Sequence, residues 1–154
     1  MKKIGYGLLV LSLVLCFAGC QKQNENISSS LSDIMKEVYK NIPEDELPEL
    51  INEKVNKDNQ EYYLGSSDIT YKEALASEPL MSSVAHSVVL VRANSIKDVD
   101  NIKKEIKEKI DPRKWICVGV DEKNVFVESK GDLVILIMDN EYASTIRDNF
   151  LNLK

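Results

Sequence analysis

Hydrophobic residues in this chain of 154 residues follow two kinds of spacing. Steps of three and four residues, which are typical of amphipathic helices, predict helices at residues 31–41, 96–110 and 143–153. Short runs of aliphatic and β-branched residues, which are typical of buried strands, predict strands at residues 85–92, 115–120, 125–128 and 132–138. Lys130-Gly131 between the last two strands predicts a hairpin.

The region between the first predicted helix and the first predicted strand has a weaker pattern. A helical turn or two is predicted after Pro48, and an extended piece at residues 61–64. Thr70 and Glu73 have the spacing of a capping box, which predicts a short helix that Pro79 ends.

Taken together, these elements predict the α+β class. We expect a mostly antiparallel sheet of about four strands with helices packed on it. A βα unit from Val88 to Val120 is expected to supply the crossover of this sheet.

The N-terminal residues have the layout of an export signal. Two lysines precede an apolar run at residues 4–17, and the small residues Ala18-Gly19 lead into Cys20. This layout resembles a bacterial lipoprotein signal, and the resemblance implies cleavage before Cys20 and attachment of a diacylglycerol to its sulfur. Ordinary secretion and a retained anchor are the alternatives, although the run is shorter than the roughly 20 residues that span a bilayer.

Three segments follow from this interpretation. Residues 1–19 are the predicted signal peptide, and residues 20–30 are a lipidated, polar and flexible tether. Residues 31–154 are predicted to form a single domain, which is within the ordinary size range. We therefore expect the protein at the cell membrane, anchored by lipid on the extracytoplasmic face.

Composition narrows the range of partners. The chain has 20 basic and 25 acidic residues and a formal net charge of −5. A nucleic-acid partner is not expected, because phosphate binding requires a basic surface. Attraction to anionic lipids is not expected either, so the membrane is a predicted partner only through acylated Cys20.

Cysteine and histidine give little support to catalysis. Cys117 is the only cysteine beyond the signal and Cys20, and its apolar neighbours favour a small buried residue over a reactive thiol. His86 is the only histidine, and no close spacing of ligand types predicts a metal site.

Serine chemistry and nucleotide binding are also weakly supported. Ser82, Ser83 and Ser87 lie near His86, but the chain lacks the nucleophile-elbow pattern of serine hydrolases. Glycine-rich phosphate loops are absent from the sequence. We therefore predict no catalytic residues and no cofactor.

A candidate recognition surface is formed by cationic and aromatic residues at predicted strand ends: Arg92, Arg113, Lys114 and Trp115. Such groups are suited to an acidic or aromatic ligand. The alternative is that Trp115 anchors the core and the charges face solvent. Tyr62 and Tyr63 carry the same ambiguity between packing and recognition.

Three sequence blocks, at residues 78–83, 86–91 and 111–118, resemble the DUF4358 family of exported bacterial proteins. This family is a domain of unknown function, so the resemblance implies export and a fold but transfers no functional residues. The sequence predicts a lipid-anchored extracytoplasmic binding or protein-interaction module. A hydrolase-like envelope enzyme is the second hypothesis, and a structural envelope component is the third.

Overall fold

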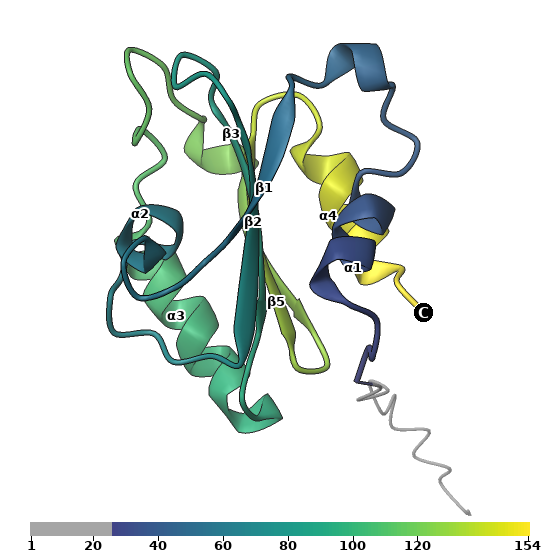
Figure 1. Ribbon diagram of the computed structural model, residues 1–154, viewed down its shortest axis with the longest axis vertical. Coiled ribbons are helices and arrows are strands. Elements are labelled where there is room, and N and C mark those ends of the chain that lie inside the picture. Colours follow the sequence, from purple (N-terminus) through teal and green to yellow (C-terminus); the bar gives the residue numbers. More distant parts are fainter. Residues whose placement is uncertain (1–25) are drawn as a thin grey trace, which may run out of the picture.

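The computed structural model describes residues 26–154 as one five-stranded antiparallel sheet with helices on both faces (Figure 1). The strand order is β1-β2-β3-β5-β4. The strands are β1 (Leu50–Lys54), β2 (Glu73–Pro79), β3 (His86–Arg92), β4 (Val125–Lys130) and β5 (Leu133–Asp139). The helices are α1 (Leu31–Val38), α2 (Gln60–Leu64), α3 (Val99–Lys109) and α4 (Ala143–Leu151). The predicted signal peptide and Cys20 lie outside the described residues.

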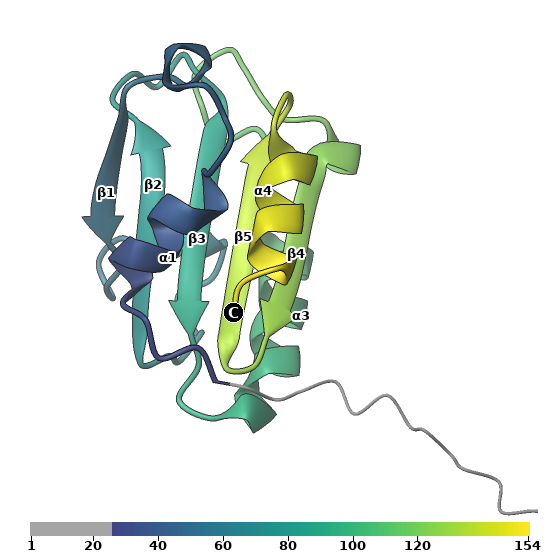
Figure 2. The same ribbon diagram turned by 90° about the vertical axis from the view of Figure 1, so that its right-hand side faces the viewer.

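The predicted α+β class is confirmed, with five strands in place of about four. Figure 2 shows α1 and α4 across one face of the sheet, whereas α2 and α3 cover the other. Alternate residues of β3 face the two layers, so Val88 and Leu90 pack under α1 and α4 while Val89 and Val91 pack toward α3. Because helices cover both faces, β3 and β5 are buried along their whole length.

The crossover from β3 through α3 differs from the expected one. It ends in β4 at Val125, at the sheet edge, because β5 occupies the position beside β3. Residues 115–120, predicted as a strand, form a loop instead. This loop closes on itself where the backbone N–H of Val120 donates to the carbonyl of Pro112 at 2.8 Å.

The secondary-structure types predicted between Pro48 and Pro79 were wrong. The segment after Pro48 is strand β1, residues 61–64 belong to helix α2, and the expected helix opened by Thr70 is strand β2. The reason is tertiary pairing, because β1 pairs with β2 and β2 pairs with β3 in continuous antiparallel registers. Such pairing overrides local propensity.

Helix α2 ends at Gly65, which adopts the left-handed conformation with φ of 76°. A Cβ atom at this position would lie 2.5 Å from the backbone carbonyl of Lys109. Glycine is therefore required both for the turn and for the close contact between α2 and α3.

Two helix starts carry serine caps. The Ser30 hydroxyl accepts from the backbone N–H of Asp33, and Ser95 accepts from Lys97 before α3. Within α3, Glu105 and Lys109 form an ion pair one helical turn apart, at 2.8 Å. Such caps and pairs fix where the helices begin and how they are solvated.

The structured chain begins before Leu31. Ile27, which we assigned to the tether, is buried with 6% of its surface exposed. The Arg92 guanidinium donates to the carbonyls of Ile27 and Ser29, both at 2.7 Å. Residues 26–30 therefore pack on the domain at one end of the sheet, which we call the base.

Candidate functional site

Four connections gather at the opposite end of the sheet, which we call the loop end (Figure 1). They are the α1–β1, β2–β3, α3–β4 and β5–α4 connections. Three large apolar side chains are exposed there: Leu80 at 55%, Met81 at 65% and Ile116 at 65%. We call these three residues the apolar tip, and exposed apolar groups of this kind mark interaction surfaces.

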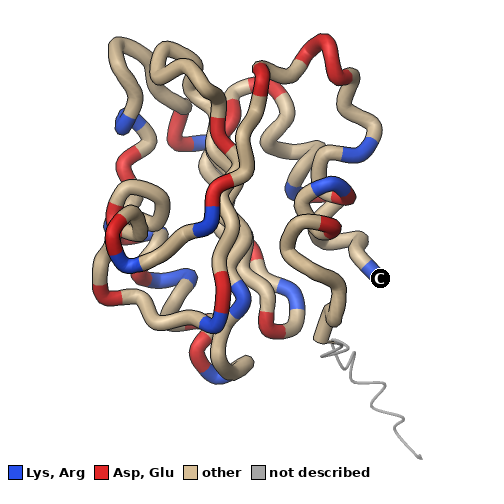
Figure 3. The backbone as a smooth tube through the Cα atoms, viewed as in Figure 1, with Lys and Arg blue, Asp and Glu red and all other residues tan. Residues whose placement is uncertain are grey.

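The two loops that carry the apolar tip are joined, and the segments around the tip are uncharged. The backbone N–H of Ile116 donates to the carbonyl of Ser82 at 3.0 Å. Residues 80–85 and residues 115–120 contain no Lys, Arg, Asp or Glu, and the tips of the loops are accordingly tan in Figure 3. The two loops therefore present the apolar tip on one joined, uncharged stretch of backbone.

Lys114 anchors the α3–β4 loop from below. Its ammonium group forms a buried ion pair with Glu78 and lies 4.3 Å from the centre of the Tyr62 ring. Burial lowers the pKa of Lys114 and outweighs the opposing effect of Glu78. Glu78 also accepts from the hydroxyls of Tyr62 at 3.1 Å and Ser87 at 2.6 Å. This network fixes the loop against the sheet.

Trp115 is the second anchor of the same loop. Its side chain is only 6% exposed and packs in the core between the sheet and α3. The next residue, Ile116, then points outward because the loop turns at Cys117, whose φ is 62°. Burial of Lys114 and Trp115 is therefore what presents Ile116 to solvent.

A cavity of about 510 Å³ opens at the loop end beside these loops. Its apolar walls come from Leu47, Pro48, Val84, Ala85, Val118 and Tyr142. Glu46, Asp139 and Glu141 supply its charged groups, and His86 also lines it. We call it the loop-end cavity, and its mixture of apolar walls and a few polar groups is typical of binding sites.

A buried hydrogen-bonded chain of Tyr39, His86 and Asp139 lies under this cavity. His86 and Asp139 are direct neighbours on β3 and β5, with 2.8 Å between Nδ1 and Oδ2. The Tyr39 hydroxyl is 2.7 Å from His86 Nε2. Burial raises the pKa of Tyr39, so the hydroxyl stays protonated, and it donates to Nε2 when the ring proton of His86 lies on Nδ1 beside Asp139.

This chain joins three elements of the fold. The other carboxylate oxygen of Asp139 accepts from the backbone N–H groups of Glu141 and Tyr142, just before α4. Both ring nitrogens of His86 are therefore occupied by protein groups. Ser87 does not pair with His86, because its hydroxyl donates to Glu78 at 2.6 Å.

The structure separates the predicted recognition residues. Lys114 and Trp115 lie together at the loop end, 5.3 Å apart between the ammonium and the ring centre. Arg113 is exposed on the same loop. Arg92 is buried at the base, paired with Glu73 at 2.8 Å, because β3 runs its whole length between the two ends. These four residues do not form one surface.

The apolar tip and the Tyr39–His86–Asp139 chain were not identified from the sequence. The only sequence signal for the tip is at residues 80–85, which carry no charge and include Leu80 and Met81. The structure places this stretch between β2 and β3, outside the sheet. The hydrogen-bonded chain unites residues from three distant segments and therefore leaves no local pattern. Cys117, expected to be buried, is exposed because its loop replaces the predicted strand.

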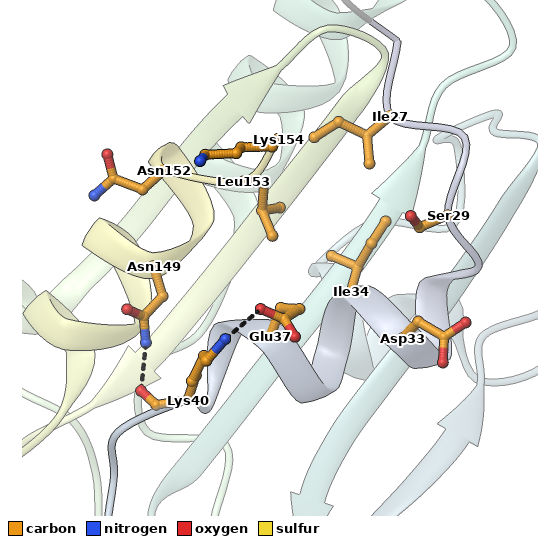
Figure 4. Close-up of a pocket in the computed structure, with 10 residues that line it drawn as sticks. All are labelled: Ile27, Ser29, Asp33, Ile34, Glu37, Lys40, Asn149, Asn152, Leu153 and Lys154. Atoms are coloured by element: carbon orange, nitrogen blue, oxygen red, sulfur yellow. Dashed lines mark hydrogen bonds and ion pairs between the residues drawn. The ribbon is translucent and has the colours of Figure 1, made fainter.

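Another cavity, of about 460 Å³, lies between α1 and α4 (Figure 4). Ile34 and Leu153 face one another across it, and Asn149 donates to the carbonyl of Lys40 at 2.8 Å. Lys40, which follows α1, lies 3.4 Å from the Glu37 carboxylate, so these two charges compensate one another. We regard it as a weaker candidate than the loop-end cavity.

Comparisons with known proteins find no similar family model, curated protein or solved structure. The resemblance to the DUF4358 family therefore stays a prediction. Within residues 26–154, no helix has the length and apolar character to cross a bilayer. The same residues hold no group of three or more side chains placed to bind a metal ion.

Proposed function

We propose that this protein is a lipid-anchored extracytoplasmic module that binds another protein through its loop end. The observation that carries the proposal is the apolar tip, where Leu80, Met81 and Ile116 are more than half exposed on two joined loops. Exposing large apolar side chains has a free-energy cost that burial against a partner removes.

The position of the tip relative to the chain start supports this proposal. The described chain begins at the base, where Arg92 holds Ile27, and the loops that carry the apolar tip connect the strands at the other end of the sheet (Figure 2). With lipid on Cys20, the stretch from Cys20 to Ile27 spans at most about 25 Å. The base then stays within about 25 Å of the membrane, and the tip at the opposite end of the sheet is free to point away from it.

A test compares crosslinking pulldowns of the anchored protein from intact cells. The tip variant replaces Leu80, Met81 and Ile116 with serine, and we expect it to lose a partner that the unchanged protein captures. The control variant replaces Ile96 and Leu151, exposed at 42% and 38% away from the loop end. Equal capture by the tip variant would contradict the proposal, whereas loss in both variants would show that general surface hydrophobicity drives the capture.

A cell-envelope enzyme remains the second proposal, favoured only by the Tyr39–His86–Asp139 chain beside the loop-end cavity. It ranks second because His86 presents no unoccupied ring nitrogen to the cavity. Turnover of a cell-wall substrate by the purified protein, abolished by Tyr39→Phe with the fold intact, would reverse this order.

A further inference from the structure

We propose that the loop-end cavity receives a lysine or arginine side chain of the partner protein, next to an apolar segment that packs on the apolar tip. This inference rests on the proposed function and specifies the chemistry of the partner. The surface that it describes combines the exposed tip with a cavity whose charged groups all have one sign.

The charge of the cavity is the first argument. Glu46, Asp139 and Glu141 line it, and no lysine or arginine does. Three other cavities of residues 26–154 each include at least one lysine, such as Lys40 between α1 and α4. The loop-end cavity is therefore distinguished by its negative charge, and charge complementarity selects a cationic group.

Two of the three carboxylates are available to a ligand. Asp139 is committed to His86 and to the start of α4. Glu46 and Glu141 are exposed, and within the described part of the chain their side chains form no ion pair or hydrogen bond. They come from the α1–β1 and β5–α4 connections, so a cation between them would bring two separate segments together.

The apolar walls favour a long side chain over a compact ion. Leu47, Val84 and Tyr142 offer contact to the methylene groups of lysine or arginine while the charged head meets carboxylates. A small metal ion would gain nothing from these walls, because divalent cations require several oxygen ligands around them.

The same features disfavour the other occupants. The acidic lining of the cavity repels anionic lipid headgroups, and this repulsion opposes insertion of the neighbouring apolar tip into a membrane. A second copy of the chain carries a formal net charge of −5 and is repelled as a whole. A protein segment that combines apolar and basic residues fits both the tip and the cavity.

The test places a photoreactive amino acid at Ser83, an exposed position on the cavity wall, in the full-length anchored protein in its own cells. Glu46→Gln with Glu141→Gln removes both available charges. Asp45→Asn with Glu49→Gln is the matched control, because it removes the same charge from exposed neighbours that do not line the cavity.

We expect the first variant to lower the yield of the protein adduct by on the order of tenfold, and the control to change it less than about twofold. Mass spectrometry should find lysine or arginine beside apolar residues in the crosslinked partner peptide. Equal yields in the two variants, a peptide without a basic residue, a lipid adduct or an adduct between two copies would each overturn the inference.

The tip variant separates this inference from the proposed function. If serine at Leu80, Met81 and Ile116 abolishes the adduct while Glu46→Gln with Glu141→Gln does not, the loop end binds a protein without using the cavity charge. If the tip variant also keeps the adduct, the proposed function itself is wrong.

Discussion

The backbone N–H of Ile116 donates to the carbonyl oxygen of Ser82 at 3.0 Å, which joins the α3–β4 loop to the β2–β3 loop. Because of this bond, apolar side chains from two distant parts of the sequence form one exposed surface. Lys114 and Trp115 support the arrangement from the buried side. The loop end is thus a preorganised surface, and preorganisation reduces the entropy cost of binding.

Lys114→Met should destabilise the domain by about 3 kcal/mol, because it leaves the Glu78 carboxylate buried without its cation. Urea denaturation monitored by circular dichroism measures this change in the free energy of unfolding. Adding Glu78→Gln should recover more than about 1 kcal/mol, since the neutral amide still accepts from Ser87. A double variant as unstable as Lys114→Met alone would refute the role of the ion pair.

Tyr39→Phe should reduce stability at neutral pH by about 1–3 kcal/mol, because His86 Nε2 loses its hydrogen-bond partner. Burial raises the pKa of Tyr39, so its stabilising contribution is complete below the unfolded pKa of about 10 and is lost as pH rises through the folded pKa. The stability difference between the two proteins should therefore narrow above about pH 10. Urea titrations of both proteins across this pH range, with tyrosinate absorbance followed in parallel, measure the difference. A stability difference that stays constant above about pH 10 would contradict this account.

Arg92→Met should release residues 26–30 from the base, because the guanidinium no longer holds the carbonyls of Ile27 and Ser29. Hydrogen exchange should accelerate at the start of α1 while β3 and β5 stay protected. Arg113→Met is the control, since Arg113 is exposed. Similar exchange in both variants would show that the Arg92 contacts do not hold this segment.

Cys20→Ala should abolish incorporation of labelled fatty acid and shift the protein from the membrane fraction to the soluble fraction. The reason is that the predicted acyl chains are the only membrane attachment that we propose, and buried methylene groups supply its energy. Labelling that persists in the variant would place the lipid elsewhere or exclude it.

The elements predicted correctly from the sequence are those in which the spacing of hydrophobic residues matches the pattern of buried side chains. The α3 stripe and the apolar run of β5 are confirmed because their side chains meet the core in the periods that helices and strands impose. The helix predicted where β2 forms was wrong. Thr70 and Glu73 have the spacing of a helix cap, but pairing with β1 and β3 stabilises a strand there. Such pairing is a tertiary effect that no local pattern contains.

The candidate site was predictable only in part. Lys114 and Trp115 were singled out for their chemistry, and the structure shows that they lie at the loop end as buried anchors. Arg92 has the same chemistry but lies at the base, since residue type does not determine which end of a strand faces a site. The loop-end cavity depends on four connections meeting in space, which requires the fold.

The most direct test of the central claim places a photoreactive amino acid at Leu80 in the anchored protein in living cells. Lys104, whose side chain is 69% exposed on α3, is the comparison position in the same protein. Our account predicts one discrete protein adduct from position 80 and none from position 104. The absence of a protein adduct at position 80, or the same adduct from both positions, would contradict it.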